Sequence, residues 1–100
     1  MAQNTGVIGG YNYSNITAAA PTTTAVKSGK GVLHSLTFNK PTATGVVKIY
    51  DNTAASGTLI GTITVPANPQ PSTLLYDASF ATGLTILTET AASDITVTYI

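Results

Sequence analysis

Residues 31–39 read GVLHSLTFN, and this short run carries the strongest strand signal in the chain. Side chains at alternate positions of a β-strand point to the same face. One face then carries the larger set, which we expect to point into a core: Val32, His34, Leu36 and Phe38. The other face carries Leu33, Ser35 and Thr37. The pattern predicts a strand, with His34 packed on its buried side.

The same period of two recurs from residue 11 to the end of the chain. Turn-forming residues separate the repeats, most clearly at residues 28–31 (SGKG) and at residues 66–71 (PANPQP), because proline cannot continue a central strand. About eight short strands follow, at residues 11–17, 22–27, 31–39, 46–51, 58–65, 73–77, 84–88 and 94–100. Strands of this number and spacing predict an all-β domain, a single antiparallel β-sandwich that is jelly-roll-like.

The alternation also assigns side chains to faces. Val47 and Ile49 are expected to point into the core. In residues 58–65, one face is expected to hold Leu59, Gly61, Ile63 and Val65. Tyr76 and Tyr99 lie on apolar faces and are expected to be core residues. The final strand has no polar tail, which predicts that it is paired within a sheet or against a neighbour, since an exposed edge invites aggregation.

The chain is expected to consist of a flexible arm followed by one folded domain. Residues 1–10 are rich in glycine and predict a flexible N-terminal arm, which could lie along a neighbouring subunit. Residues 11–100 have the length of one domain. The start of the chain has no basic segment followed by an apolar run, and no 18-residue apolar stretch occurs, so we expect synthesis in a cytoplasm and no membrane partner.

The chain carries little charge. Charged residues make up 8% of the sequence, against about 25% in an ordinary soluble domain. The net charge is zero and there are nineteen threonines. Nucleic-acid binding depends on a basic face, which four scattered lysines balanced by four acids do not provide. A net charge near zero promotes association, so part of the surface is expected to be covered in an assembly.

The residues needed for catalysis are scarce. Acid–base and nucleophilic catalysis require a histidine, a cysteine or paired carboxylates within reach of one another. The chain has one histidine, no cysteine and four acids that are well separated in sequence. Asp51, Asn52 and Asp77 could supply oxygen ligands to calcium, but acids at strand ends more often cap turns. We expect no enzyme activity, no catalytic residue, no metal and no cofactor.

Four residues are the candidates for a binding surface. Aromatic side chains are enriched where proteins bind partners and sugars. Tyr11 and Tyr13 lie near the N-terminal arm, Tyr50 falls on the outward side of its strand, and Ile100 ends the last strand. We therefore predict that Tyr11, Tyr13, Tyr50 and Ile100 take part in an interface.

Several strand-and-turn stretches resemble a known family. These are residues 31–39, 45–51 (GVVKIYD), 56–63 (SGTLIGTI), 75–77 (LYD) and 80–85 (FATGLT), and the likeness covers residues 25–100. They resemble small β-sandwich virion proteins of tailed bacteriophages, which are typically head-decoration or fibre-like components and often trimers. The matching positions are structural, so no functional residue is carried over.

The resemblance implies a structural virion protein. The expected role is a capsid decoration or cement protein on the outer surface of a tailed phage, located on the virion after synthesis in the host cytoplasm. It would act as a homo-oligomer, with a trimer favoured, and dock on the major capsid protein or another virion protein. The alternative is a carbohydrate-binding or host-adhesion module that uses Tyr50 and the polar loops 51–57 and 66–71.

Overall fold

The computed structural model describes residues 10–100. The predicted flexible arm therefore lies, apart from Gly10, outside the described residues. All eight predicted strands are present, with ends that differ from the predicted ones by at most three residues. They are β1 (Asn12–Ile16), β2 (Thr22–Ser28), β3 (Gly31–Lys40), β4 (Val46–Asp51), β5 (Thr58–Thr64), β6 (Ser72–Phe80), β7 (Gly83–Glu89) and β8 (Asp94–Tyr99). The described part of the chain contains no helix that is long and apolar enough to cross a membrane.

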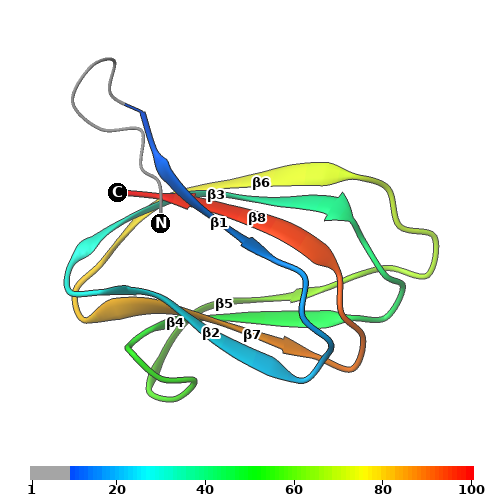
Figure 1. Cartoon of the computed structure of the whole chain (residues 1–100), viewed down its shortest axis with the longest axis horizontal. Helices are drawn as coiled ribbons and strands as arrows, with labels where there is room; N and C mark the ends of the chain where they lie inside the picture. Colours follow the sequence, from blue (N-terminus) through cyan, green and yellow to red (C-terminus); the bar gives the residue numbers. More distant parts are fainter. Residues whose placement is uncertain (1–9) are drawn as a thin grey trace.

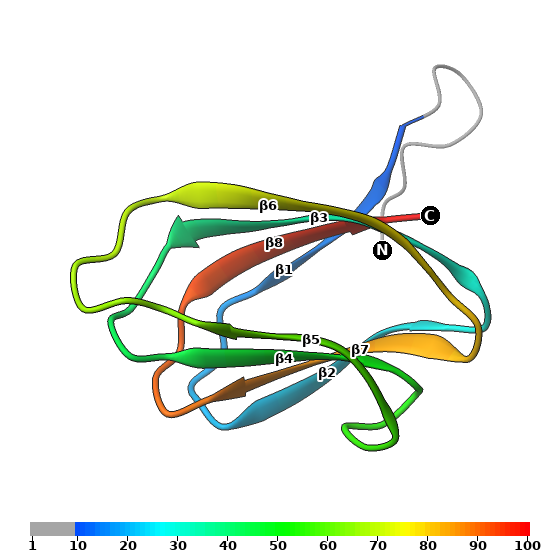
Figure 2. The same cartoon turned by 180° about the vertical axis from the view of Figure 1, so that it is seen from behind.

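The strands form two antiparallel sheets of four strands each. Sheet A has the order β1-β8-β3-β6, and sheet B has the order β2-β7-β4-β5. The chain passes from one sheet to the other at every connection except the β4–β5 hairpin. This is the strand order of a jelly roll, so the predicted fold class is confirmed. Figures 1 and 2 show the two layers from opposite sides.

The connections gather at the two ends of the sandwich (Figure 1). The C-terminus lies at the same end as the β2–β3, β4–β5 and β6–β7 connections, and we call this the terminal end. The other four connections lie at the opposite, distal end. The last strand is paired on both sides, with β1 and with β3, as expected from its apolar sequence.

The core lies between the two sheets. Inward residues of both sheets are almost fully buried: Ile16, Leu33, Leu36, Phe38, Val47, Ile49, Val65, Phe80, Leu84, Ile86, Ile95, Val97 and Tyr99. The predictions for Val47, Ile49 and Tyr99 are confirmed, and Tyr76 packs partly buried against this cluster. Full burial of one such aliphatic side chain is worth about 1.5–3 kcal/mol, so this layer supplies most of the driving force for folding.

The predicted position of His34 is wrong. Leu33, not His34, is fully buried in the first half of β3, while Leu36 and Phe38 are buried in its second half. The register with β8 shifts between Leu33 and Ser35, so His34 is the extra residue of a β-bulge. A bulge interrupts the period of two and re-aims the side chain. His34 consequently leaves the core face and stands 28% exposed.

A second bulge moves Leu59. The β4–β5 register shifts between Ile49 and Tyr50, where Gly61 pairs with Ile49 and Leu59 pairs with Tyr50. Ile60 is the extra residue and packs against the core, whereas Leu59 is 45% exposed. The prediction that Leu59 shares the face of Gly61, Ile63 and Val65 is therefore wrong.

Candidate functional site

Exposed apolar side chains gather on the outer face of sheet A. Of the six large apolar side chains that are at least 36% exposed in residues 10–100, four belong to this face. They are Tyr11 (40%), Tyr13 (51%), Leu75 (69%) and Ile100 (51%), and together we call them the apolar patch. Three of them are predicted interface residues, and the structure brings these three to one face.

Strand alternation explains why these side chains point outward. Tyr99 and Ile16 are buried on the inner side of sheet A, so their strands turn Ile100 and Tyr13 to the outer side. The backbone of Ile100 exchanges two hydrogen bonds with Val32, which continues the ladder to the end of the described chain. Leu75 follows Leu74, whose side chain faces the space between the sheets.

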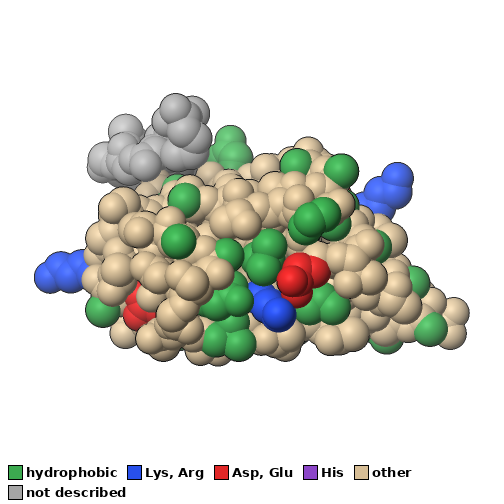
Figure 3. Space-filling view, turned by 90° about the horizontal axis from the view of Figure 1, so that it is seen from below, with side chains coloured by type: hydrophobic (Ala, Val, Ile, Leu, Met, Phe, Trp, Pro, Cys, Tyr) green, Lys and Arg blue, Asp and Glu red, His purple; other side chains and the backbone are tan. Residues whose placement is uncertain are grey.

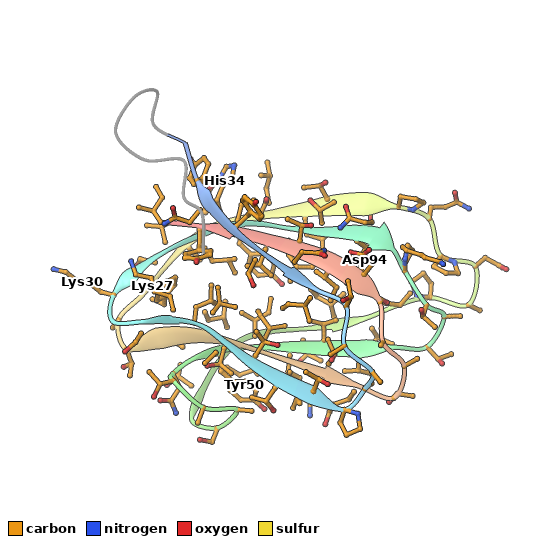
Figure 4. All side chains as sticks on the ribbon, viewed as in Figure 1. Lys27, Lys30, His34, Tyr50 and Asp94 are labelled. Carbon is orange, nitrogen blue, oxygen red and sulfur yellow. The ribbon has the colours of Figure 1, made fainter. Side chains whose placement is uncertain are left out.

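A histidine–aspartate pair lies beside this patch. His34 Nδ1 and Asp77 Oδ1 are 2.5 Å apart, and the ring of Tyr11 stacks on the His34 ring with centroids 3.9 Å apart and planes 2° from parallel. Figure 4 shows His34 on the outer side of sheet A. Tyr11 precedes β1 and His34 lies in β3, so the stacked rings span β8 between them.

Two neighbouring bulges bring the pair together. On β6, two residues lie between Leu75 and Ala78. On β3, only one residue lies between their partners Ser35 and Leu33, so β6 has one extra residue here. Asp77 lies in this insertion with a φ of 46°, in the left-handed region that L-residues other than Asn and Asp rarely adopt. Non-glycine residues held in this region cost free energy and cluster at functional sites.

The chemical capacity of this pair is limited. Which of the two atoms donates depends on the tautomer of the imidazole ring. Within residues 10–100, Asp77 is the only hydrogen-bond partner of the ring. The nearest hydroxyls in sequence register, Ser35 Oγ and Thr98 Oγ1, bond to each other at 2.6 Å. Among the described residues, the ring therefore has a carboxylate that orients it and no hydroxyl hydrogen-bonded to it.

A polar cluster occupies the distal half of the same face. Asp94 Oδ1 accepts hydrogen bonds from Asn15 Nδ2 (2.7 Å) and from Asn39 Nδ2 (3.1 Å). Asn39 Nδ2 also donates to Thr96 Oγ1 at 2.8 Å. The Asn15 amide first, and then the Asn39 amide, hold the pKa of the Asp94 carboxyl below its ordinary value. The cluster ties β1, β8 and β3 together and keeps an ionised acceptor at the surface.

Asp51 has a structural role at the terminal end. Its carboxylate accepts hydrogen bonds from the backbone N–H groups of Ala81 (3.0 Å), Thr82 (2.8 Å) and Gly83 (3.4 Å). These donors, Ala81 first, lower the pKa of the Asp51 carboxyl. Asp51 thus bonds to the β6–β7 turn, whereas Asp77 bonds to His34. The two carboxylates considered as calcium ligands therefore have separate partners.

The outer face of sheet B has a different character. Tyr50 points outward from β4, as predicted, but it is half-buried and is separated by the core from the other three predicted interface residues. Lys48 Nζ and Glu89 Oε1 form an ion pair at 3.1 Å on this sheet. Figure 3 shows this face, with one adjoining blue and red pair among tan and green atoms.

No family model, no curated protein and no solved structure matched this chain.

The sequence prediction missed Leu75 and the His34–Asp77 pair. A signal for Leu75 exists: Leu74 and Leu75 are adjacent in a strand, so one of them must point away from the core. The pair has no comparable signal, because it depends on two bulges whose positions the alternation does not mark.

Proposed function

We propose that this chain is a structural subunit of a virion, a decoration protein that docks on the capsid of a tailed phage through the outer face of sheet A. The observation that carries the proposal is the apolar patch: four of the six large exposed apolar side chains of residues 10–100 lie on one sheet face, in a chain with 8% charged residues. Large exposed apolar side chains that share one face are typical of an interaction site.

The dimensions of the face support the proposal. The molecule measures 40 × 29 × 22 Å, and its outer sheet face spans the long and short axes (Figure 1). A protein interface of ordinary size buries about 800 Å² on each partner. Docking of ordinary size would therefore use most of this face. Tyrosines are enriched at the positions that contribute most of the binding energy, and Tyr11 and Tyr13 are such candidates.

The role of the His34–Asp77 pair in this proposal is structural. It holds the ring of Tyr11 against the ring of His34, because the His34 ring is itself fixed by Asp77. A side chain held in one orientation before binding loses less entropy on docking. We therefore propose no enzymatic activity.

Co-sedimentation with phage particles tests the proposal. We expect the purified chain to bind particles from its own source, and we expect the double substitution Tyr13→Ser with Leu75→Ser to abolish binding. Tyr50→Ser is the matched control, since it removes an outward tyrosine from the opposite sheet. Electron microscopy of the particles would then show density for the chain on the capsid surface. Equal loss in both variants, or no binding by the unaltered chain, contradicts the proposal.

A second candidate function is glycan binding, and the Asp94 cluster favours it. A carboxylate flanked by the Asn15 and Asn39 amides offers acceptors and donors to neighbouring sugar hydroxyls, and Tyr13 lies two residues from Asn15 on the same side of β1. In this second candidate the glycan binds at the Asp94 cluster, and not at Tyr50 and the loops at residues 51–57 and 66–71 as the sequence alternative has it. A glycan array tests it: saturable binding that Tyr13→Ala and Asp94→Ala abolish supports the candidate, and an array without hits removes it.

A further inference from the structure

A groove of about 350 Å³ opens between β5 and β6 near the distal end, and we call it the β5–β6 groove. Its apolar lining includes Phe38, Ile63, Val65, Pro69 and Leu74. None of its lining residues carries a charge. By contrast, a hollow of about 620 Å³ at the terminal end is lined by Lys27, Lys30 and Asp51. The β5–β6 groove is thus suited to an uncharged, apolar occupant.

The two strands beside the groove have unpaired edges. β6 is the last strand of sheet A and β5 is the last strand of sheet B, so within residues 10–100 neither has a neighbour on its outer side. The backbone N–H and C=O groups of such an edge can pair with an added strand. An extended segment can therefore pair with one edge and insert alternate side chains between the sheets.

The sequence of residues 1–9 fits this site. It reads MAQNTGVIG and contains no charged side chain. Val7 and Ile8 are β-branched, a type that favours extended conformations, and glycines flank them at positions 6 and 9. We infer that residues 1–9 of one copy bind in the β5–β6 groove of a second copy, with Val7 and Ile8 supplying the apolar contact.

Geometry excludes the groove of the same copy. Asn12 and Leu33 both pair with Tyr99, and the groove is centred near the Phe38–Ser72 pair. Phe38 pairs with Ile95, four residues from Tyr99 along β8. That is about 14 Å along the strands and about 14 Å across three strand spacings, or about 20 Å in all. Ile8 is four residues from Asn12 and reaches at most about 14 Å.

The inference goes beyond the proposed function, because it concerns association between copies through the sandwich edge and not docking through the sheet face. Lysine substitutions at two adjacent leucines test the docking through the sheet face and the association between copies separately. Leu74 lines the groove, whereas Leu75 lies in the apolar patch. We expect Leu74→Lys to convert the oligomer to a monomer in sedimentation velocity, and Leu75→Lys to leave the oligomer intact while it weakens docking on particles.

Deletion of residues 1–9 provides the second measurement. The truncated chain should be a monomer that binds a labelled peptide of residues 1–10 saturably. Replacement of Val7 and Ile8 by serine in the peptide, or Leu74→Lys in the protein, should weaken this binding by about tenfold to a hundredfold, since each removes apolar contact or buries a charge. A truncated chain that keeps the full oligomer mass, or a peptide that binds both protein variants equally, overturns the inference.

Disulfide trapping locates the contact directly. The chain has no cysteine, so a new pair is unambiguous. Ile8→Cys mixed with Ser72→Cys should give a covalent dimer of the two variants under mild oxidation, and Ile8→Cys mixed with Thr23→Cys, on the exposed part of β2, should not. A monomer crosslinked within itself when Ile8→Cys and Ser72→Cys are combined in one chain, or a full-length chain that is monomeric at every soluble concentration, overturns the inference.

Discussion

His34 and Asp77 meet because each lies at an inserted position of its strand. His34 is the extra residue of β3 relative to β8, and Asp77 lies in the insertion of β6 relative to β3, so the two irregularities are adjacent across the sheet. Their side chains then turn to the same outer face, where Nδ1 and Oδ1 are 2.5 Å apart. A regular ladder would place His34 in the core, as the alternation predicts.

The backbone of Asp77 provides the first prediction. An L-residue with a φ of 46° is disfavoured by roughly 1–2 kcal/mol relative to glycine, which adopts this region freely. We expect Asp77→Ala to be less stable than Asp77→Gly by about 1 kcal/mol, although both lose the bond to His34. Urea unfolding of the two variants measures the difference. Equal midpoints would show that the left-handed conformation is not maintained.

The Asp51 carboxylate provides a prediction about pH. Its folded-state pKa is lowered from the ordinary value of 3.8 by the N–H groups of the β6–β7 turn. The ionised form therefore stabilises the fold above about pH 4, and this contribution is lost as the pH falls through the folded-state pKa. We expect Asp51→Asn to destabilise the protein at pH 7 and to flatten the loss of stability between neutral and acid pH. Thermal unfolding across this range measures it, and parallel profiles for both proteins would contradict it.

Gly29, in the β2–β3 connection, and Gly31, the first residue of β3, should respond differently to alanine. At Gly29 a new Cβ meets open space, but the alanine must adopt a φ of 91°. At Gly31 a new Cβ would clash with the backbone oxygen of Ile100 and lie 2.8 Å from the ring of Phe80. We expect Gly29→Ala to cost about 1 kcal/mol and Gly31→Ala to cost about 3 kcal/mol or to prevent folding. Denaturant unfolding ranks the two, and the reverse order would contradict the close approach at Gly31.

Truncation of two leucines should separate core from surface. Leu36 is fully buried, so Leu36→Ala is expected to cost about 2–5 kcal/mol. Leu75 is 69% exposed, and Leu75→Ala should change stability by less than about 0.5 kcal/mol. Both values come from urea titrations of the isolated chain. A large cost at Leu75 would mean that the apolar patch is already covered in the free protein.

Much of the fold follows from the period of two, since that period reflects which side of a half-buried strand meets the core. It locates all eight strands and the inward positions of β4 and β8. It fails at His34, Leu59 and Ile60, because a bulge reverses the assignment of the residues beside it and depends on contacts with strands far away in sequence. Pairing order is likewise a property of the whole chain, which local alternation does not encode.

The candidate site was predictable in part. Tyr11, Tyr13 and Ile100 stand out as aromatic or terminal apolar residues, and they do share a face. Tyr50 has the same sequence character, yet its strand belongs to sheet B. Only the assignment of strands to sheets separates it from the others. The polar cluster of Asn15, Asn39 and Asp94 joins three distant segments, so no local pattern announces it.

The near absence of hairpins affects how the chain can fold during translation. Within residues 10–100, β4 and β5 are the only sequence neighbours that pair, while β1 must find β8, with Asn12 opposite Tyr99. At synthesis rates of about 5–20 residues per second, β1 waits roughly 4–20 s for its partner. Long-range pairing of this kind also slows folding to milliseconds or seconds. Among the described strands, β1 is thus the last to gain a neighbour, and sheet A closes only after β8 has been synthesised.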